Sequence, residues 1–363
     1  MNSEDFKIES DISRAQTLPS SFYRSQTQFD RTREAIFAKS WHCIGLESDL
    51  PPSGAAQPFV LMPGYLDEPL LLLSNEEGQS GCYSNVCTHR GNLLVMEGGP
   101  CAQLRCRYHG RRFDLNGKML SMPEFKEAKN FPAESDHLPK LPLKKLGNLL
   151  FTSLSANYSF EQWLQPVLDR LSWMPFEAFR HAPDYGQTYE VNGHWALYVD
   201  NYLEGFHIPF VHPGLSELLS YPDYTYECYE YANLQLGVAK EGEQAFDLPA
   251  SSPDYGKQIA AYYYWLFPNI MLNFYPWGLS LNIVEPVSVD KTTVRFENFI
   301  WKEDIFEPAH IDRMHLTEIE DEAVVESVQK GINSRLYHRG RYSPKQEVAV
   351  HHFHRLIAQA LKA

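Results

Sequence analysis

Two short loops of the sequence each place a cysteine beside a histidine. The first, CTHRG, covers residues 87–91, and the second, CRYHG, covers residues 106–110. The order of the four side chains is C-x-H, then sixteen residues, then C-x-x-H. Thiolates and imidazoles are common protein ligands of transition metals. The pattern therefore predicts one metal centre held between the two loops.

The way the donors are divided indicates what this centre holds. Zinc sites usually have two cysteines close together and two histidines close together, whereas here each loop supplies one of each. A [2Fe–2S] cluster suits this division, because both thiolates bind one iron and both imidazoles bind the other. We expect Cys87 and Cys106 to hold the first iron and His89 and His109 the second. A zinc site of the Cys₂His₂ type is the alternative.

A second pair of histidines lies in the segment DNYLEGFHIPFVHPG, residues 200–214. His207 and His212 are five residues apart, which does not match one face of a regular helix. Pro209 between them permits a local break that turns both imidazoles to one point. Two histidines and a distant carboxylate form the facial triad of non-haem iron(II) oxygenases, which leaves positions open for O₂ and substrate. For this histidine pair taken alone, the alternative is a purely structural role in packing.

With both motifs in view, the sequence resembles the α subunits of the ring-hydroxylating oxygenases. CTHRG and CRYHG resemble the Rieske motif of that family, and RRFDLNGK, residues 111–118, resembles the strand that follows it. Arg111 is a departure, because many members have tryptophan there. Asn92 and Tyr108 occupy the places where respiratory Rieske proteins carry two further cysteines, so the resemblance is to the oxygenase and ferredoxin type.

The resemblance also implies roles for residues around the second histidine pair. His207 and His212 match the iron ligands of the family, and Asn201 matches a polar residue near the iron. Glu204 matches a carboxylate that bridges a Rieske histidine of one subunit to an iron-ligating histidine of its neighbour, here His109 to His207. Many members have aspartate at that place, while glutamate is shared by the branch of choline, glycine betaine and carnitine monooxygenases.

The third iron ligand is expected in a later helix. The segment EIEDEAVVESVQKG, residues 318–331, resembles the family segment in which an acidic residue lies five positions before a glutamate. That offset indicates Asp321, which precedes Glu326. Other acidic residues surround it, and only one side of the helix can face inward. A solvated acidic helix face is the alternative.

These candidate ligands need two different kinds of domain to position them. Residues 1–40 have helix-like spacing of apolar residues, and residues 41–153 alternate short apolar runs with Gly, Pro and Asn, as in an all-β Rieske domain. Residues 154–363 mix helical segments with successive strands. This predicts an α+β catalytic domain of the helix-grip type, an antiparallel sheet with helices packed on it. In it, TYEVNGHWALYV reads as a strand that runs into a helix starting at DNYLEGFH.

Composition excludes several classes of partner. Hydrophobic residues are 44 % and charged residues 21 % of the chain, as in soluble globular proteins. The net charge of −14 disfavours nucleic acid and anionic membrane surfaces. The acidic start MNSEDFKIES lacks the apolar core of a signal peptide, and no run is long enough to span a membrane. We therefore expect a cytoplasmic enzyme.

Two further motifs can be interpreted as purely structural or as functional. Aromatic residues are dense between 221 and 277, and they either pack strands or form a cage for a quaternary ammonium group. The pairs Tyr263 with Trp265 and Tyr275 with Trp277 are candidates to line such a cage. The run HHFH, residues 351–354, is expected on a helix surface or in a subunit contact.

The resulting expectation is a terminal oxygenase with two cofactors, a Rieske [2Fe–2S] cluster and a mononuclear Fe(II). The chain lacks a dinucleotide fingerprint and a plant-type cluster motif, so electrons must come from NAD(P)H through a separate reductase. The resemblance implies a homotrimer with head-to-tail contacts. The favoured reaction is monooxygenation of a small substrate, for which a quaternary ammonium compound that loses a methyl group is the candidate. The alternatives are dihydroxylation of an aromatic ring and a Rieske electron carrier without catalysis.

Overall fold

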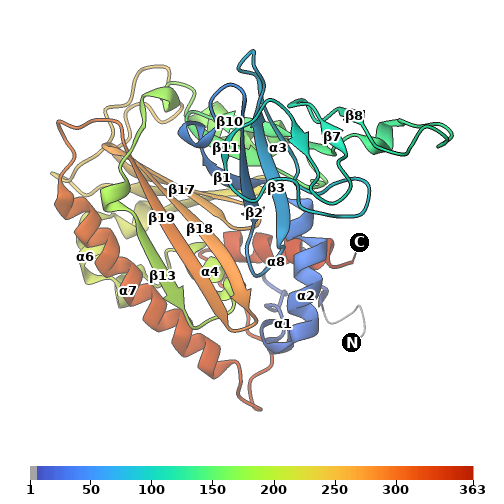
Figure 1. The fold of residues 1–363 in the computed structure, drawn as a ribbon. Helices are drawn as coiled ribbons and strands as arrows, with labels where there is room; N and C mark the ends of the chain where they lie inside the picture. Colours follow the sequence, from blue (N-terminus) through green and yellow to red (C-terminus); the bar gives the residue numbers. More distant parts are fainter. Residues whose placement is uncertain (1–5, 363) are drawn as a thin grey trace. The chain divides into compact units, whose positions relative to one another are not determined.

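The structure is a computed structural model that describes residues 6–362. The chain divides into two compact units, one made of residues 41–156 and the other of residues 1–40 together with 157–363. The first is all-β, and the second combines a large antiparallel sheet with helices (Figure 1). The expected α+β class, with a β Rieske domain before a sheet-and-helix catalytic domain, is confirmed.

The first unit consists of three small antiparallel sheets. Their members are, in order along each sheet, β1 (His42–Leu46), β11 (Leu149–Thr152) and β10 (Leu143–Leu146); β5 (Gly99–Pro100), β2 (Ala55–Leu61), β3 (Glu68–Ser74), β4 (Ser80–Ser84) and β9 (Lys140–Leu141); and β6 (Leu104–Arg105), β7 (Arg112–Phe113) and β8 (Met119–Ser121). The cysteine–histidine loops follow β4 and β6. Both therefore start from paired strands, which fixes where each loop begins.

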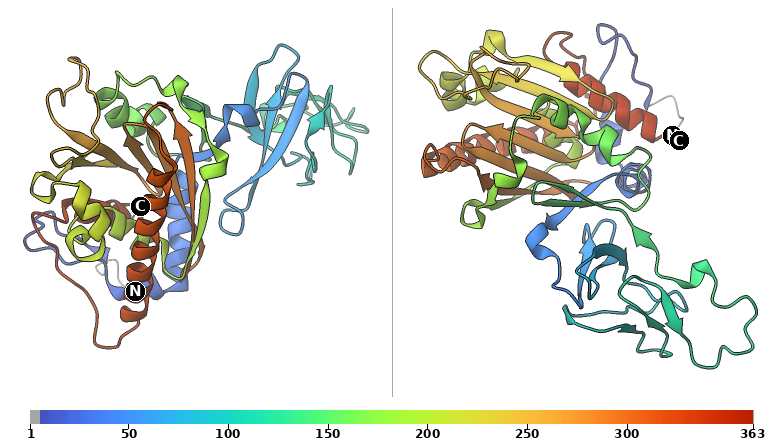
Figure 2. Two further views of the ribbon diagram at one scale, coloured as in Figure 1. Left: turned by 90° about the vertical axis from the view of Figure 1, so that its left-hand side faces the viewer. Right: turned by 90° about the horizontal axis from the view of Figure 1, so that it is seen from above.

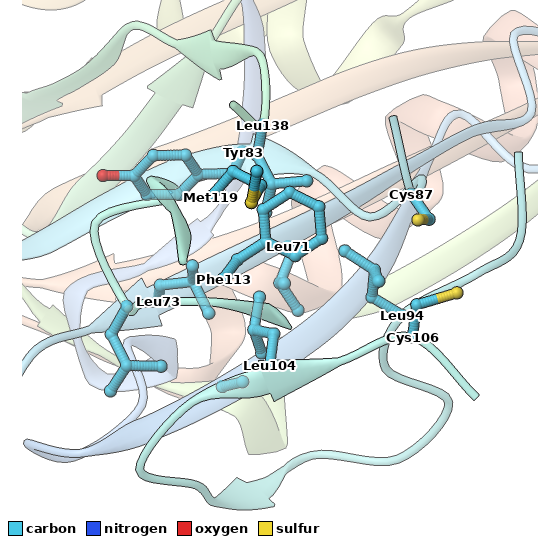
Figure 3. Packing of buried hydrophobic residues seen from close by; sticks show 12 residues of the cluster. Leu71, Leu73, Tyr83, Cys87, Leu94, Leu104, Cys106, Phe113, Met119 and Leu138 are labelled. Carbon is cyan, nitrogen blue, oxygen red and sulfur yellow. The ribbon is translucent and has the colours of Figure 1, made fainter. Parts of the chain in front are cut away.

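A buried apolar cluster lies beneath the two loops. It includes Leu71 and Leu73 of β3 and Phe113 of β7, all essentially inaccessible to solvent. Cys87 and Cys106 belong to the same cluster and lie at one end of it in Figure 3. The apolar side chains below the loops thus fix the positions of both thiols.

The second unit is organised by an eight-stranded antiparallel sheet. The order is β12 (Arg180–His181), β19 (Lys291–Ile300), β18 (Gly278–Ser288), β17 (Ile270–Tyr275), β16 (Ile259–Leu266), β15 (Ala232–Val238) and β14 (Thr225–Cys228), with β13 (Gln187–Val191) also paired to β19. Its helices are α1 (Ser20–Arg24), α2 (Gln26–Ala35), α3 (Phe160–Arg170), α4 (Trp195–Tyr202), α5 (Ile208–Val211), α6 (Pro213–Leu218), α7 (Pro308–Gly331) and α8 (Val348–Ala360). Figures 1 and 2 show α7 running along the sheet beside β13, which it contacts.

Two sequence expectations about this unit were wrong. The strand that begins near Gln187 ends at Val191, and α4 already begins at Trp195, because His194 accepts the Ala196 N–H as its N-cap. The HHFH run does not lie on a helix surface. His351 and His354 are buried, and His354 Nε2 lies 2.7 Å from Asp200 Oδ1. Its carboxylate partner Asp200 is 154 residues away, which sequence proximity does not reveal.

None of the helices described between residues 6 and 362 is long and apolar enough to cross a bilayer.

Candidate metal centres and active site

The two cysteine–histidine loops share one backbone design. In the first, the Cys87 N–H donates to the Asn92 carbonyl at 2.9 Å and the Gly91 N–H donates to the Cys87 carbonyl at 3.0 Å. The second repeats both bonds around Cys106, at 2.8 and 3.0 Å. The glycine that ends each loop has a positive φ, +73° and +76°, which side-chain-bearing residues rarely adopt. Two equivalent loops therefore present equivalent donor pairs.

The four side chains of these loops converge on one place. Cys87 and Cys106 are each 2 % exposed and belong to one buried cluster. The rings of His89 and His109 are edge to face, with centroids 4.8 Å apart. His109 Nδ1 is buried, yet it has no hydrogen-bond partner among the described residues. A buried imidazole nitrogen left without a partner fits a metal ligand, so this donor set fits a cluster bound by two thiolates and two imidazoles.

Arg111, the departure noted in the motif, is buried beside the loops. Its Nη1 donates to Thr88 Oγ1 at 2.8 Å and its Nη2 to Asp136 Oδ1 at 3.2 Å. Thr88 stands between the two donors of the first loop, whereas Arg111 follows the second. The guanidinium therefore joins the two loops.

Helix breaks position the second histidine pair. His207 directly precedes the short helix α5 and His212 directly follows it, with φ −115° and ψ 79°. Pro209 lies in the first turn of α5, and Pro213 opens α6. Proline is tolerated at these positions because it donates no backbone N–H. The chain thus turns twice within six residues, and both imidazoles face the same point.

Asp321 of α7 meets both imidazoles. One donor atom from each of His207, His212 and Asp321 lies within 4.8 Å of the others. His212 Nε2 is 3.0 Å from Asp321 Oδ1 and 3.1 Å from His207 Nε2. His212 is 1 % exposed, and the other two side chains are mostly buried. Two imidazole nitrogens and one carboxylate oxygen converging in this way fit an iron(II) facial triad.

A further set of polar side chains orients these donors. Glu204 Oε1 lies 2.7 Å from His207 Nδ1, and Glu320 Oε2 lies 2.6 Å from His212 Nδ1. Each carboxylate accepts the Nδ1 proton and leaves Nε2 for a metal. The Asn201 amide donates to Asp321 Oδ1. Each of the three donors is therefore held by a second polar group.

The electrostatics of the cluster follow from these contacts. Burial opposes a charge on His207, but its hydrogen bonds with Asp321 and Glu204 raise its pKa to about 9. Burial also opposes ionisation of Asp321, yet the two imidazoles keep the pKa of that carboxyl below its ordinary value. Metal binding must therefore displace a proton from this cluster, because a ligating imidazole is neutral.

A cavity of about 360 Å³ opens next to the three donors and is lined by His207, His212 and Asp321. Seven tyrosine, tryptophan and phenylalanine residues share the lining: Tyr198, Tyr202, Tyr224, Tyr263, Tyr275, Trp277 and Phe296. Tyr275 and Trp277 are stacked, with ring centroids 5.3 Å apart. Trp265 does not line the cavity; it is fully buried and donates to the Pro268 carbonyl.

One carboxyl in the lining is almost entirely buried. Glu318 is 5 % exposed, and its Oε2 accepts the Tyr198 hydroxyl at 2.8 Å. Burial and the nearby Asp321 charge raise its pKa well above the ordinary value. Burial thus favours the neutral form of Glu318, whereas the two imidazoles favour the ionised form of Asp321 one turn away.

The structure brings together every residue singled out in the sequence for each centre. Glu204 and Asn201 both contact a member of the histidine–aspartate set. Sequence reasoning did not identify the role of Glu320, because neighbouring acids on one helix look alike until the helix is packed. It also gave Arg111 no function. The buried acid Glu318 carried no sequence signal beyond its place in an acidic run.

Two family models match this chain. The model of the ring-hydroxylating α subunit catalytic domain matches residues 179–363. The model of the Rieske [2Fe–2S] domain matches residues 40–132. Together with the two donor sets, these matches confirm both expected cofactors, the Rieske cluster and the mononuclear iron.

Characterised relatives are similar along nearly the whole chain. The carnitine monooxygenase oxygenase subunit of Escherichia coli K12 is 29 % identical over 96 % of this chain and 94 % of that protein. The chloroplastic choline monooxygenase of Arabidopsis thaliana is 27 % identical over 99 % of this chain and 86 % of that protein.

Solved structures agree in fold. A quaternary ammonium Rieske monooxygenase superposes with a TM-score of 0.75 at 24 % identity, covering 99 % of this chain and 98 % of its own. Naphthalene 1,2-dioxygenase from Rhodococcus sp. gives 0.67 at 18 % identity, covering 95 % and 94 %.

Proposed function

Because this chain belongs to the family of ring-hydroxylating oxygenase α subunits, we propose that it is the terminal oxygenase of a quaternary ammonium monooxygenase. The single observation that carries the proposal is the aromatic cavity that opens onto the histidine–aspartate donors. The similarity to carnitine and choline monooxygenases supports it.

We assign the ligands residue by residue. Cys87, Cys106, His89 and His109 would hold the cluster, and His207, His212 and Asp321 would hold the mononuclear iron. The buried, unpartnered Nδ1 of His109 and the converging donors of the second set support these assignments. Iron bound there supplies the redox chemistry that activates O₂.

The aromatic lining supports a cationic substrate. A quaternary ammonium group cannot accept or donate a hydrogen bond, and aromatic faces attract it through cation–π interaction. Five carboxyl side chains also line the cavity: Glu204, Glu243, Glu318, Glu320 and Asp321. Arg313 is the one lysine or arginine among the described lining residues. An ammonium group near the donors and a carboxylate near Arg313 would suit this charge distribution, as in a betaine.

The reaction we propose is oxidative N-demethylation. One oxygen atom of O₂ is inserted into a C–H bond of an N-methyl group, and the other is reduced to water by two electrons and two protons. The hydroxymethyl product then loses formaldehyde, because its C–N bond breaks as the hydroxyl proton leaves. Tyrosine, tryptophan and phenylalanine side chains would hold the methyl groups against the iron side of the cavity and exclude water.

A separate NAD(P)H reductase would supply the electrons, as the name oxygenase subunit indicates for the Escherichia coli relative. The family resemblance suggests a homotrimer in which Glu204 links the His109 side of one subunit to His207 of the next. Exposed apolar side chains near both centres support such a contact, since Phe210 is 80 % exposed and Tyr108 is 57 % exposed. A cytoplasmic location remains our expectation.

The test is turnover by the full chain with both cofactors loaded. Protein purified without oxygen is supplied with NADH, a reductase, O₂ and either γ-butyrobetaine, choline or naphthalene, and formaldehyde and NADH are measured. We expect about one formaldehyde per NADH from a methylammonium substrate. Asp321→Ala should keep the cluster spectrum, lose the mononuclear iron and lose formaldehyde. A wild-type protein that releases no formaldehyde and instead converts naphthalene to a cis-diol would support the dioxygenase and overturn the proposal.

A further inference from the structure

Among residues 6–362, Arg111 is the one buried cation that joins the two cluster loops. Its side chain is 2 % exposed. It contacts Thr88 of the first loop through Nη1 and Asp136 through Nη2. Thr88 Oγ1 also donates to the Asp136 carbonyl at 2.8 Å. The three residues form a closed polar network beside the ligands.

The surroundings of the guanidinium are otherwise apolar. Its carbon lies 5.7 Å from the centre of the Phe125 ring and 5.4 Å from that of Phe131. Arg111 Nε has no hydrogen-bond partner among the described residues. In such a place water does not screen the charge, so it acts on neighbouring groups more strongly than a surface cation.

The charge of Arg111 lies close to the ligands. Thr88, to which its Nη1 donates, stands between the ligands Cys87 and His89 in the chain. The Arg111 backbone carbonyl also accepts the N–H of Cys106, a ligand of the second loop. Its carboxylate partner Asp136 is partly exposed, at 19 %, so the cation is the more deeply buried member of the pair.

We propose that Arg111 is a positioning and redox-tuning residue of the Rieske cluster. It ties Thr88 of one ligand loop to the end of the other and holds a positive charge beside them. Reduction adds one electron to the cluster, and a fixed, poorly screened cation stabilises the added negative charge. The reduction potential is therefore higher than it would be with a neutral residue. Tryptophan, which many family members have here, supplies no such charge.

The experiment compares the midpoint potential of the cluster in wild type and in variants of the cluster-loaded full chain. The potential is measured by mediated redox titration, with the visible and EPR signals of the cluster as the readout. We expect Arg111→Met and Arg111→Trp to lower the midpoint potential and Arg111→Lys to lower it less. Asp136→Asn should raise it, because the cation is then unopposed. Arg112→Met is the matched control, because the adjacent Arg112 is exposed and its Nε donates to Ser121 Oγ, outside the loops. The potential of this variant should equal that of wild type.

One further variant separates the link between the loops from the effect of charge. Thr88→Val removes the link between the loops without changing charge, and we expect altered EPR g values with a smaller change of potential. If Arg111→Met loses its cluster, Arg111→Lys and Asp136→Asn still report the charge effect with opposite signs. The proposal is overturned if Asp136→Asn does not raise the potential, or if a fully loaded Arg111→Met has the wild-type potential. None of these readouts depends on the substrate proposed above.

Discussion

Glu204 and His207 form a close pair at the start of α5, with Oε1 of the carboxylate 2.7 Å from Nδ1 of the ring. The other oxygen of Glu204 accepts the His207 backbone N–H at 3.0 Å. The glutamate therefore fixes both the backbone and the ring of this histidine. Nε2 is left facing His212 and Asp321.

We expect Glu204→Gln to retain the iron and the cluster but to reduce turnover by about ten-fold or more. A neutral amide holds the His207 imidazole less firmly than a carboxylate, and it supports the proposed electron transfer between the two centres less well. The measurement is product formed per oxidised cluster in a single turnover. Glu217→Gln, at an exposed acid of α6, is the control. Wild-type single-turnover yield and rate in Glu204→Gln would rule out this role.

Glu320→Gln tests the support of the second ligand. Glu320 lies 2.6 Å from His212 Nδ1, and a charged acceptor makes the imidazole a stronger metal ligand. We expect iron affinity to fall by about 10- to 100-fold. Equilibrium iron binding under anaerobic conditions checks this, with exposed Asp312→Asn of the same helix as control. An unchanged affinity would mean that Glu320 is dispensable.

His194 predicts an acid sensitivity of the second unit. Burial lowers its pKa to about 3, whereas an unfolded histidine has a pKa of about 6.5. The unfolded chain therefore binds a proton that the folded one does not, and stability present above pH 6.5 is lost as the pH falls from there toward 3. The loss is about 1.4 kcal/mol per pH unit for this one group.

His194→Asn keeps an N-cap residue for α4 and removes the titration. We expect its free energy of unfolding to fall less steeply than that of wild type between pH 6.5 and 5, measured by urea denaturation. Equal slopes for the two proteins would contradict the burial argument.

Asp254 anchors a buried ion-pair network away from the metal centres. It is fully buried, and Arg170 Nε and Lys257 Nζ lie 2.6 and 2.8 Å from its oxygens. Removing one partner leaves a poorly solvated cation, so Asp254→Ala should destabilise the second unit by about 3 kcal/mol or more. Urea denaturation followed by tryptophan fluorescence measures this. Asp30→Ala, from an exposed pair with Arg33, should change stability by less than about 1 kcal/mol.

The local spacing of residues in the sequence was sufficient to predict where the two cluster loops and the histidine pair lie. In each loop the cysteine and its glycine are four residues apart, and the glycine N–H donates to the cysteine carbonyl. The geometry of the donors therefore depends on only a few neighbouring residues. The break between His207 and His212 is likewise local, since Pro209 and Pro213 lie within the same short segment. The alternation of short apolar runs with Gly, Pro and Asn was sufficient to predict the fold class.

Tertiary structure decided everything that depends on contacts between distant segments. His212 and Asp321 are 109 residues apart, and only the packing of α7 against α4 decides that Asp321 and Glu320 reach the histidines. The same packing buries Glu318, and this burial raises the pKa of its carboxyl. The same holds for His354, whose partner Asp200 lies on another helix. The physical reason is that burial and charge pairing depend on which faces of the helices and strands pack together. Residue types and their spacing do not determine that packing.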